Sequence, residues 1–286
     1  MTCAKELKLG TIIYSTQNEA SLNIIRHLEQ DWNWKKQNDK LYTFSACGKK
    51  DCCTGVKAIG WDKNIIEIEP EIESNYFLYA SPHKSEKQLP TFTAHYPGNW
   101  SDAGFGGDAK TLNIAYACKL KQILKFLHEK NSELELGWQV CAEVDHHGPT
   151  LKNKDLPLIF VEIGSTQKEW GNEIAGKIVA EAMFKSLLRT EPKYPTYIAF
   201  GGGHYAPKFT DFILGRKLLD SQEIAISHIC PKYKIDEIDE HMIVQAIQKT
   251  LEPVCGALID KKGLSKEQRT KVEQILQKHN IKTIYV

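Results

Sequence analysis

Short apolar runs alternate with amphipathic segments along most of this chain. Runs rich in β-branched and aromatic residues are typical of buried strands, whereas apolar residues three and four apart indicate helices. On this basis we predict strands at 9–14, 41–46, 65–68, 76–80, 91–95, 136–144, 156–163, 197–200, 223–229 and 283–286. We predict helices at 20–28, 112–128, 170–188, 209–219, 239–251 and 265–279. The alternation predicts a three-layer α/β/α fold with a mixed central sheet.

The pattern is interrupted between residues 32 and 68, where tryptophans and lysines replace the regular spacing. We therefore expect a single α/β domain over residues 1–286, with an inserted subdomain around 32–68. Three closely spaced cysteines, Cys47, Cys52 and Cys53, lie within this insertion. A structural zinc site usually needs a second cysteine pair at suitable spacing, and no such pair follows. A surface hairpin is the favoured interpretation, with a metal clip as the alternative.

Composition narrows the class of protein. The chain is 42% hydrophobic and 26% charged, which is ordinary for a soluble globular protein. Its formal net charge of +1 gives no global basic field, so a nucleic-acid partner would need a local basic patch. The start of the chain lacks an apolar signal segment, and no run is long enough to span a bilayer. We expect a cytoplasmic protein with free thiols and no membrane partner, despite its eight cysteines.

One stretch combines a predicted strand end with residues suited to ligand binding or catalysis. The buried strand predicted at 197–200 ends in three glycines, 201–203, and His204 follows them directly. Glycine lets the backbone take positive φ and approach a ligand closely. In open α/β sheets, ligands tend to bind beyond the carboxyl ends of the strands, where this loop would lie. An imidazole there is suited to proton transfer or to metal binding near neutral pH.

Other histidines share this position after a strand. The full set is His83, His95, His146, His147 and His204. Two acidic residues accompany them, Glu143 at a strand end and Glu162 within an apolar run. A carboxylate inside such a run is expected to be paired or ligating, unless it faces water at an edge. If the strands share one sheet edge, these groups converge on one cleft.

Such a cleft suits hydrolysis in two ways. Imidazole and carboxylate ligands favour Zn²⁺, which lowers the pKa of a bound water and polarises a carbonyl. Alternatively, a histidine acts as general base on free water while amides or a lysine hold the oxyanion. Asp145, His146 and His147 are adjacent in sequence, so their side chains cannot all face one ion in extended backbone. Neither a GxSxG elbow nor an HExxH helix is present in the sequence.

Five blocks of sequence, in order, carry a family resemblance. They are residues 81–85, 89–95, 144–149, 162–166 and 202–207. Together they resemble the archaeal and plant type of D-aminoacyl-tRNA deacylase, and the resemblance runs over most of the chain. Pro97 and Asp145 depart from the family pattern, so no specific role is carried over to those two positions.

The resemblance implies hydrolysis of the ester that joins a D-amino acid to the 3′ end of tRNA, a proofreading reaction that recycles mischarged tRNA. It also implies zinc dependence and a fold similar to those of nucleoside phosphorylases and peptidyl-tRNA hydrolase. The implied partner is D-aminoacyl-tRNA, contacted at its 3′ end and acceptor stem mainly through phosphates. We expect a monomer or weak homo-oligomer. Candidate phosphate contacts are Lys84, Lys87, Lys208, Arg216 and Lys217.

The resemblance marks the strand-exit histidines and Glu162 as function-bearing, and the individual roles are our own hypothesis. We assign catalysis to His146, His147, His204 and Glu162. We assign zinc binding to His83, His95 and His146. We assign substrate binding to Lys84, Gly202, Gly203 and Tyr205. The glycine backbone is expected to exclude an L side chain sterically, which is how an editing site spares correct product.

Two alternatives belong to other functional classes. A zinc-dependent peptidase or amidohydrolase would use the same cleft on a small substrate and would cleave free aminoacyl amides without tRNA. A non-catalytic tRNA- or nucleoside-binding protein would bind its ligand after the change His204→Ala and would show no turnover before or after it.

Overall fold

The computed structural model describes residues 9–45, 55–152 and 155–286. Its contacts divide the chain into two compact units. The first unit comprises Met1–Thr93, Phe126–Val140 and Phe160–Glu191, and the second comprises Ala94–Lys125, Cys141–Ile159 and Pro192–Val286. Our expectation of one domain with an inserted subdomain stays a prediction. The cysteines of the predicted hairpin at 47–53 lie outside the described residues.

The first unit is built on a mixed sheet. This sheet has eight strands in the order β2-β3-β4-β1-β5-β10-β6-β9, all of them wholly or partly in the unit. Strand β1 pairs in parallel with β4 and β5, whereas β3 runs antiparallel to β4. The strands are β1 (Thr11–Ser15), β2 (Lys35–Asn38), β3 (Leu41–Ser45), β4 (Gly55–Trp61), β5 (Phe77–Lys84), β6 (Thr91–His95), β9 (Gln139–Ala142) and β10 (Leu158–Ser165).

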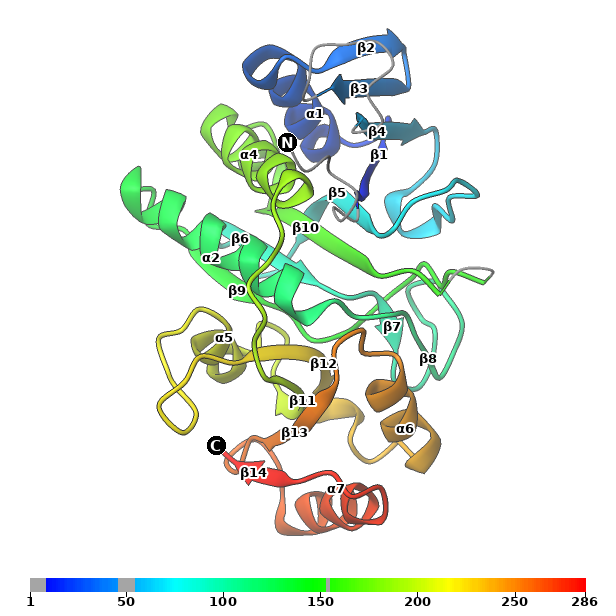
Figure 1. The fold of residues 1–286 in the computed structure, drawn as a ribbon, viewed down its shortest axis with the longest axis vertical. Coiled ribbons are helices and arrows are strands. Elements are labelled where there is room, and N and C mark those ends of the chain that lie inside the picture. The colour runs from blue at the N-terminus through cyan, green and yellow to red at the C-terminus, as the bar shows by residue number, and fades with distance from the viewer. Residues whose placement is uncertain (1–8, 46–54, 153–154) are drawn as a thin grey trace, which may run out of the picture. The chain divides into compact units, whose positions relative to one another are not determined.

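Two helices of the first unit, α1 (Glu19–Trp32) and α4 (Glu173–Leu188), pack against each other, and α1 also contacts β1 and β5 (Figure 1). The short α3 (Gln167–Trp170) precedes α4. The Asn23 side chain on α1 donates hydrogen bonds to the carbonyl oxygens of Trp170 and Asn172, at 2.8 and 2.9 Å. Its amide fills the space that a Cβ at Gly176 would occupy. A glycine is therefore needed at this position of α4, because the two helices meet there.

The second unit contains a four-stranded parallel sheet in the order β12-β11-β13-β14. Its strands are β11 (Thr196–Gly202), β12 (Ala225–Pro231), β13 (Val254–Ile259) and β14 (Thr283–Tyr285). Helix α5 (Pro207–Ile213) contacts β11 and β12. Ile198 and Phe200 of β11 share a buried core with residues of α6 (Glu240–Gln248) and α7 (Lys266–Lys278). This core holds the end of β11, and hence the start of the glycine loop, in place.

Three smaller elements complete the described chain. A two-stranded ladder joins β7 (Gly98–Asn99) to β8 (Thr111–Leu112), and a turn of 3-10 helix, η2 (Lys232–Lys234), follows β12. Helix α2 (Ala117–Glu133) has residues in both units. The ladder brackets the segment 101–108.

The predicted α/β class with a mixed sheet is confirmed, but several local predictions are wrong. Residues 65–68 do not form a strand, because the Asn64 side chain caps a 3-10 turn, η1 (Ile65–Glu67). Helix α2 begins at Ala117 rather than at residue 112, because Leu112 lies in β8 and Ile114 bridges Pro157. Five strands, β2, β4, β7, β8 and β13, were not predicted. Of these, β4, β7 and β13 contain glycine, which weakens the strand pattern in the sequence.

Four of the described cysteines, Cys118, Cys141, Cys230 and Cys255, are free thiols. Burial raises the pKa of Cys118 to about 12 and that of Cys230 well above its ordinary value. These buried thiols are therefore protonated and act as small apolar groups. Within the described residues, none of the helices combines the length and the apolarity needed to cross a bilayer.

Candidate active site

Residues 143–149 form a loop after β9 that is fixed by backbone hydrogen bonds within the second unit. The Val144 amide donates to the His204 carbonyl oxygen at 3.1 Å, and the Asp145 amide donates to the Ile229 carbonyl oxygen at 3.1 Å. The Gly98 amide donates to the His147 carbonyl oxygen at 2.9 Å. The loop is thus tied to β12, to β7 and to the loop after β11. We call residues 143–149 the histidine loop.

Three imidazoles lie together on the second unit. The ring centroid of His95 is 4.3 Å from that of His146 and 4.8 Å from that of His147, and the last two are 4.4 Å apart. One nitrogen of each lies within 4.8 Å of a nitrogen of the others, close enough to share a metal ion. His95 comes from the end of β6, and the other two come from the histidine loop. The loop is not extended, since His147 has φ of +52°, so adjacent histidines can face one point.

Backbone carbonyls set the tautomer of these three histidines. His95 Nδ1 lies 3.1 Å from the Tyr96 carbonyl oxygen, His146 Nδ1 lies 2.8 Å from that of Val144, and His147 Nδ1 lies 2.5 Å from that of Gly148. A carbonyl oxygen only accepts, so each Nδ1 carries the proton and each Nε2 keeps its lone pair in the neutral ring. Metal-binding histidines commonly donate their second ring N–H to a carbonyl in this way.

The protonation state of His146 also suits a metal ligand. Burial lowers the pKa of His146 well below its ordinary value, and the neighbouring His95 and His147 lower it further. The ring is therefore neutral near pH 7, as a ligand must be. His146 Nε2 lies 3.5 Å from a carboxylate oxygen of Glu143, so two electron-rich atoms face each other. A cation between them would relieve this contact, and the donor set of imidazole nitrogens and a carboxylate fits Zn²⁺.

Glu143 also faces His204. Its Oε2 atom lies 3.3 Å from His204 Nε2, and the Glu143 side chain is buried whereas that of His204 is 39% exposed. The ring centroid of His204 is 4.9 Å from that of His146. A buried carboxylate therefore lies between the partly buried imidazole of His146 and the more exposed imidazole of His204. This arrangement gives the exposed imidazole a fixed orientation and a partner for positive charge.

The three glycines before His204 differ in what they permit. Gly201 has φ of +102°, and a Cβ there would lie 2.9 Å from Leu264 Cγ, so this position requires glycine. A Cβ at Gly202 would lie 3.2 Å from Ile229 Cγ2, which is tight. A Cβ at Gly203 would meet nothing within 4 Å. The first glycine is therefore explained by the fold, whereas the third lies against open space beside His204.

A buried pair of an aspartate and a histidine supports the histidine loop, and the sequence analysis did not identify it. Asp145 Oδ2 lies 2.9 Å from His228 Nδ1, and both side chains are buried. His228 Nε2 lies 3.1 Å from the Lys249 carbonyl oxygen, so both ring nitrogens face oxygen acceptors. Burial raises the pKa of Asp145, and the His228 charge opposes that rise.

His228 lies in β12, inside the strand predicted at 223–229, with a relative exposure of 0%, and the sequence analysis gave it no role. Its apolar neighbours Ile226 and Ile229 were the available signal that this histidine is buried. Asp145 departs from the family pattern in sequence, and its partner in the structure supplies the reason for a carboxylate there.

A further group of polar side chains lies in the first unit, on β5, β6 and β10. Glu162 Oε2 accepts a hydrogen bond from Thr93 Oγ1 at 2.9 Å and lies 3.4 Å from His83 Nδ1. His83 and Glu162 are buried, and a Cβ at Gly164 would collide with the His83 ring. Glu162 is therefore paired, as a carboxylate in an apolar strand must be. Lys84, the next residue after His83, is exposed at the end of β5.

The sequence model of the D-aminoacyl-tRNA deacylase family matches residues 70–284. A D-aminoacyl-tRNA deacylase of Pyrococcus furiosus is 34% identical over 270 residues, which is 92% of this chain and 95% of the relative. The chain belongs to the D-aminoacyl-tRNA deacylase family. Deacylases of Thermococcus onnurineus and Methanosarcina mazei are 35% and 32% identical, over 90% and 96% of this chain and 93% and 91% of their own lengths.

The crystal structure of a conserved protein of unknown function, AF0625, has the same fold. It superposes with a TM-score of 0.81 at 23% identity, over 97% of this chain and 95% of the other. The family model and the sequence relatives confirm the resemblance to the deacylase family. The roles assigned to individual residues of this deacylase-family chain stay predictions. Within the second unit, His95 and His146 are grouped with His147, to which the sequence reasoning gave a catalytic role rather than a metal-binding one.

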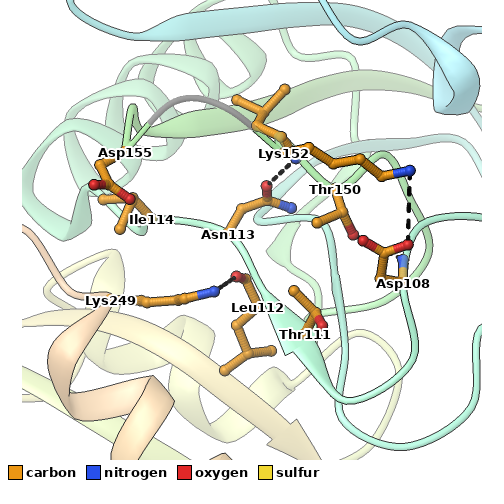
Figure 2. A pocket seen from close by; sticks show the side chains of 10 residues that line it. Asp108, Thr111, Leu112, Asn113, Ile114, Thr150, Lys152, Asp155 and Lys249 are labelled. Atoms are coloured by element: carbon orange, nitrogen blue, oxygen red, sulfur yellow. Dashed lines mark hydrogen bonds and ion pairs between the residues drawn. The ribbon is translucent and has the colours of Figure 1, made fainter.

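A cavity of about 290 Å³ lies in the second unit of this deacylase-family member, next to the histidine loop along the chain (Figure 2). Asn113 on its wall donates hydrogen bonds to the carbonyl oxygens of Pro97 and Pro149, at 2.9 and 2.8 Å. Lys249, another lining residue, donates to the Leu112 carbonyl oxygen at 2.7 Å. Asn113 therefore braces the two segments that carry His95 and His147.

Proposed function

We propose that this chain hydrolyses the ester between a D-amino acid and the 3′ end of tRNA, releasing the free D-amino acid and the tRNA. The observation that carries the proposal is the pairing of His204 with buried Glu143, 3.3 Å apart, beside the three imidazoles of His95, His146 and His147. Membership of the deacylase family supports the choice of substrate. The reaction would take place in the cytoplasm, where tRNA is charged.

His204 is the general base in this proposal. Its Nδ1 atom removes a proton from the attacking water, while Nε2–H faces the Glu143 carboxylate, which holds the ring and stabilises the imidazolium that forms. The 39% exposure of the His204 side chain lets a substrate approach it, while burial of Glu143 keeps its charge unscreened. The proton on His204 then passes to the departing 3′ oxygen of the tRNA. This assignment keeps His204 among the catalytic residues and adds Glu143.

His95, His146 and His147 would hold Zn²⁺ through Nε2, with Glu143 facing the same point. When bound, the ion would activate a water and polarise the ester carbonyl. The Nδ1 hydrogen bonds to the backbone fix the three rings in the ligating orientation. In the first unit, Glu162 holds His83 by its carboxylate, and we retain Glu162 as a catalytic and His83 as a metal-binding proposal.

Removal of metal should abolish the activity. After dialysis against a strong chelator, we expect the rate of D-aminoacyl-tRNA hydrolysis to fall by at least about 10²-fold, because water activation contributes on that scale. Addition of Zn²⁺ should restore the rate, whereas Mg²⁺ should not, because imidazole ligands favour zinc. Full activity after thorough chelation would remove zinc from the proposal and leave the deacylase.

The glycine loop would exclude L substrates. We expect Gly203→Ala to change the ratio of D to L hydrolysis by about 10-fold or more, because its Cβ projects into open space beside His204. Its melting temperature should stay within about 2 °C of the wild type, since nothing lies within 4 Å of the added carbon. Gly55→Ala, at the exposed start of β4 where a Cβ meets only the Phe44 carbonyl oxygen at 3.7 Å, is the matched control. An unchanged ratio would mean that the loop is only a turn.

The function itself is tested on two substrates with one preparation. The zinc-loaded protein is incubated with D-aminoacyl-tRNA and, separately, with the corresponding free D-aminoacyl amide, and release of the amino acid is measured. We expect release from the tRNA ester and none from the amide. Cleavage of the amide would favour a peptidase or amidohydrolase instead. Tight tRNA binding without any release would identify a binding protein.

A further inference from the structure

The most exposed large hydrophobic side chain of the described residues lies next to the histidine loop. It is Phe105, with a relative exposure of 77%, in the segment 101–108 between β7 and β8. The amide of Gly148 donates to the Phe105 carbonyl oxygen at 3.1 Å. Gly148 directly follows His147, so the backbone of Phe105 is hydrogen-bonded to the segment that carries the proposed metal ligands.

This segment is held firmly although its aromatic side chain is exposed. The Asp108 amide donates to Thr150 Oγ1 at 2.8 Å, and Asn99 Nδ2 donates to the Gly106 carbonyl oxygen at 2.8 Å. Gly106 and Gly107 have φ of +81° and +76°. A Cβ at Gly107 would lie 3.0 Å from Gly148 Cα, so the two backbones meet closely. The fold therefore fixes the backbone at Phe105 and leaves the ring in solvent.

A second exposed aromatic residue is tied to the same segment. Tyr233, in η2 after β12, has a relative exposure of 53%. Its neighbour Lys234 donates to Asp102 Oδ2 at 2.7 Å. Partial burial raises the pKa of Tyr233, and the Lys234 charge opposes that rise, so the phenol stays neutral near pH 7.

We propose that Phe105 and Tyr233 stack on unpaired nucleotides at the 3′ end of the tRNA. This inference rests on the proposed function, because the ester at the histidine loop places the terminal nucleotides beside it. Proteins hold single-stranded nucleotides chiefly by stacking bases on aromatic side chains, which contributes about 1–3 kcal/mol per base. A chain with a net charge of +1 lacks a general basic field, so stacking is the stronger local source of affinity.

The exposed Lys232 directly precedes Tyr233 and can meet a phosphate of the same strand. The site thus combines two aromatic side chains with a cation. Asp102, which pairs with Lys234, keeps η2 attached to segment 101–108.

The test compares Phe105→Ala, Phe105→Leu and Phe105→Trp with the wild type on D-aminoacyl-tRNA. Loss of one stacked base should raise KM by about 5- to 150-fold in the alanine and leucine variants, with kcat within about 2-fold. Tryptophan should restore KM to within about 3-fold, because it retains an aromatic face. Tyr233→Ala should raise KM similarly. Tyr285→Ala, an exposed aromatic residue on β14, is the control and should change nothing.

Binding of the trinucleotide cytidylyl-cytidylyl-adenosine, measured by titration, separates this inference from the proposed function. Suppose that the wild type shows no deacylase activity but binds the trinucleotide, and that Phe105→Ala and Tyr233→Ala bind it more weakly. This result would support the stacking site and reject the proposed function. An active wild type with unchanged KM and unchanged trinucleotide binding in both variants would overturn the stacking site alone. Restoration by leucine as complete as by tryptophan would also overturn it. A wild type that neither turns over nor binds the trinucleotide would overturn both.

Discussion

Glu143→Gln should lower kcat for D-aminoacyl-tRNA by roughly 10²-fold or more, while the protein stays folded. The substitution keeps the shape of the side chain and removes the charge that faces both His204 and His146. Without this charge, His204 loses the group that orients its ring and stabilises its protonated form, and general base catalysis contributes about 10²–10⁴-fold.

The same substitution, Glu143→Gln, should lower kcat without lowering the stability of the folded protein. Burial of a charge is costly, and a neutral amide in the same space costs less. We therefore expect the melting temperature of Glu143→Gln to be equal to or higher than that of the wild type. A structural role for Glu143 would instead lower it. Glu133→Gln, at an exposed position on α2, provides the control and should leave both kcat and melting temperature unchanged. Wild-type kcat in Glu143→Gln would remove Glu143 from the mechanism.

The buried pair Asp145–His228 should have the largest effect on stability. Removal of one member of a buried, hydrogen-bonded ion pair typically costs about 3–5 kcal/mol, because the other is left without its partner. We expect Asp145→Ala and His228→Ala each to lower the free energy of unfolding by about that amount, as measured by urea denaturation. The double variant should lower the free energy of unfolding by clearly less than the sum of the two single effects, because the two residues interact directly.

A matched surface pair serves as the control for this prediction. His279 Nε2 lies 3.0 Å from an oxygen of Glu240, and the two side chains are 33% and 45% exposed. Exposed pairs contribute about 0–1 kcal/mol, so His279→Ala should cost no more than that. If Asp145→Ala and His228→Ala behave like His279→Ala, or if their effects simply add, the pair does not hold the histidine loop in place.

Most of the regular elements could be predicted from apolar spacing alone. Helix α7, predicted at 265–279, is observed at Lys266–Lys278, and β10, predicted at 156–163, is observed at Leu158–Ser165. These elements have regular apolar periodicity, which depends only on local sequence. Strand β13 was missed because Gly256 interrupts its apolar run. The glycine is needed there, since a Cβ would lie 2.8 Å from the Lys282 carbonyl oxygen.

The site was less predictable, for a physical reason. The residue types at strand exits identified five histidines and Glu162, but not which of them lie together. Proximity of His95 to His147 depends on the positive φ of His147 and on the bonds that tie the loop to Gly98 and Ile229. Such contacts between distant segments leave no periodic signal in one sequence. The same holds for Asp145 and His228, which are 83 residues apart and form one pair.

Stereoselective release of the amino acid provides the most direct measurement. One tRNA is charged separately with the D and the L enantiomer of the same amino acid, and zinc-loaded protein is added in excess so that a single turnover is followed. We expect the wild type to cleave the D ester at least about 10²-fold faster than the L ester. In Glu143→Gln this difference should be lost, because the rate of cleavage of the D ester falls. Equal rates for the two enantiomers, or no release of the D-amino acid, would contradict the proposed function of this histidine and glutamate cluster.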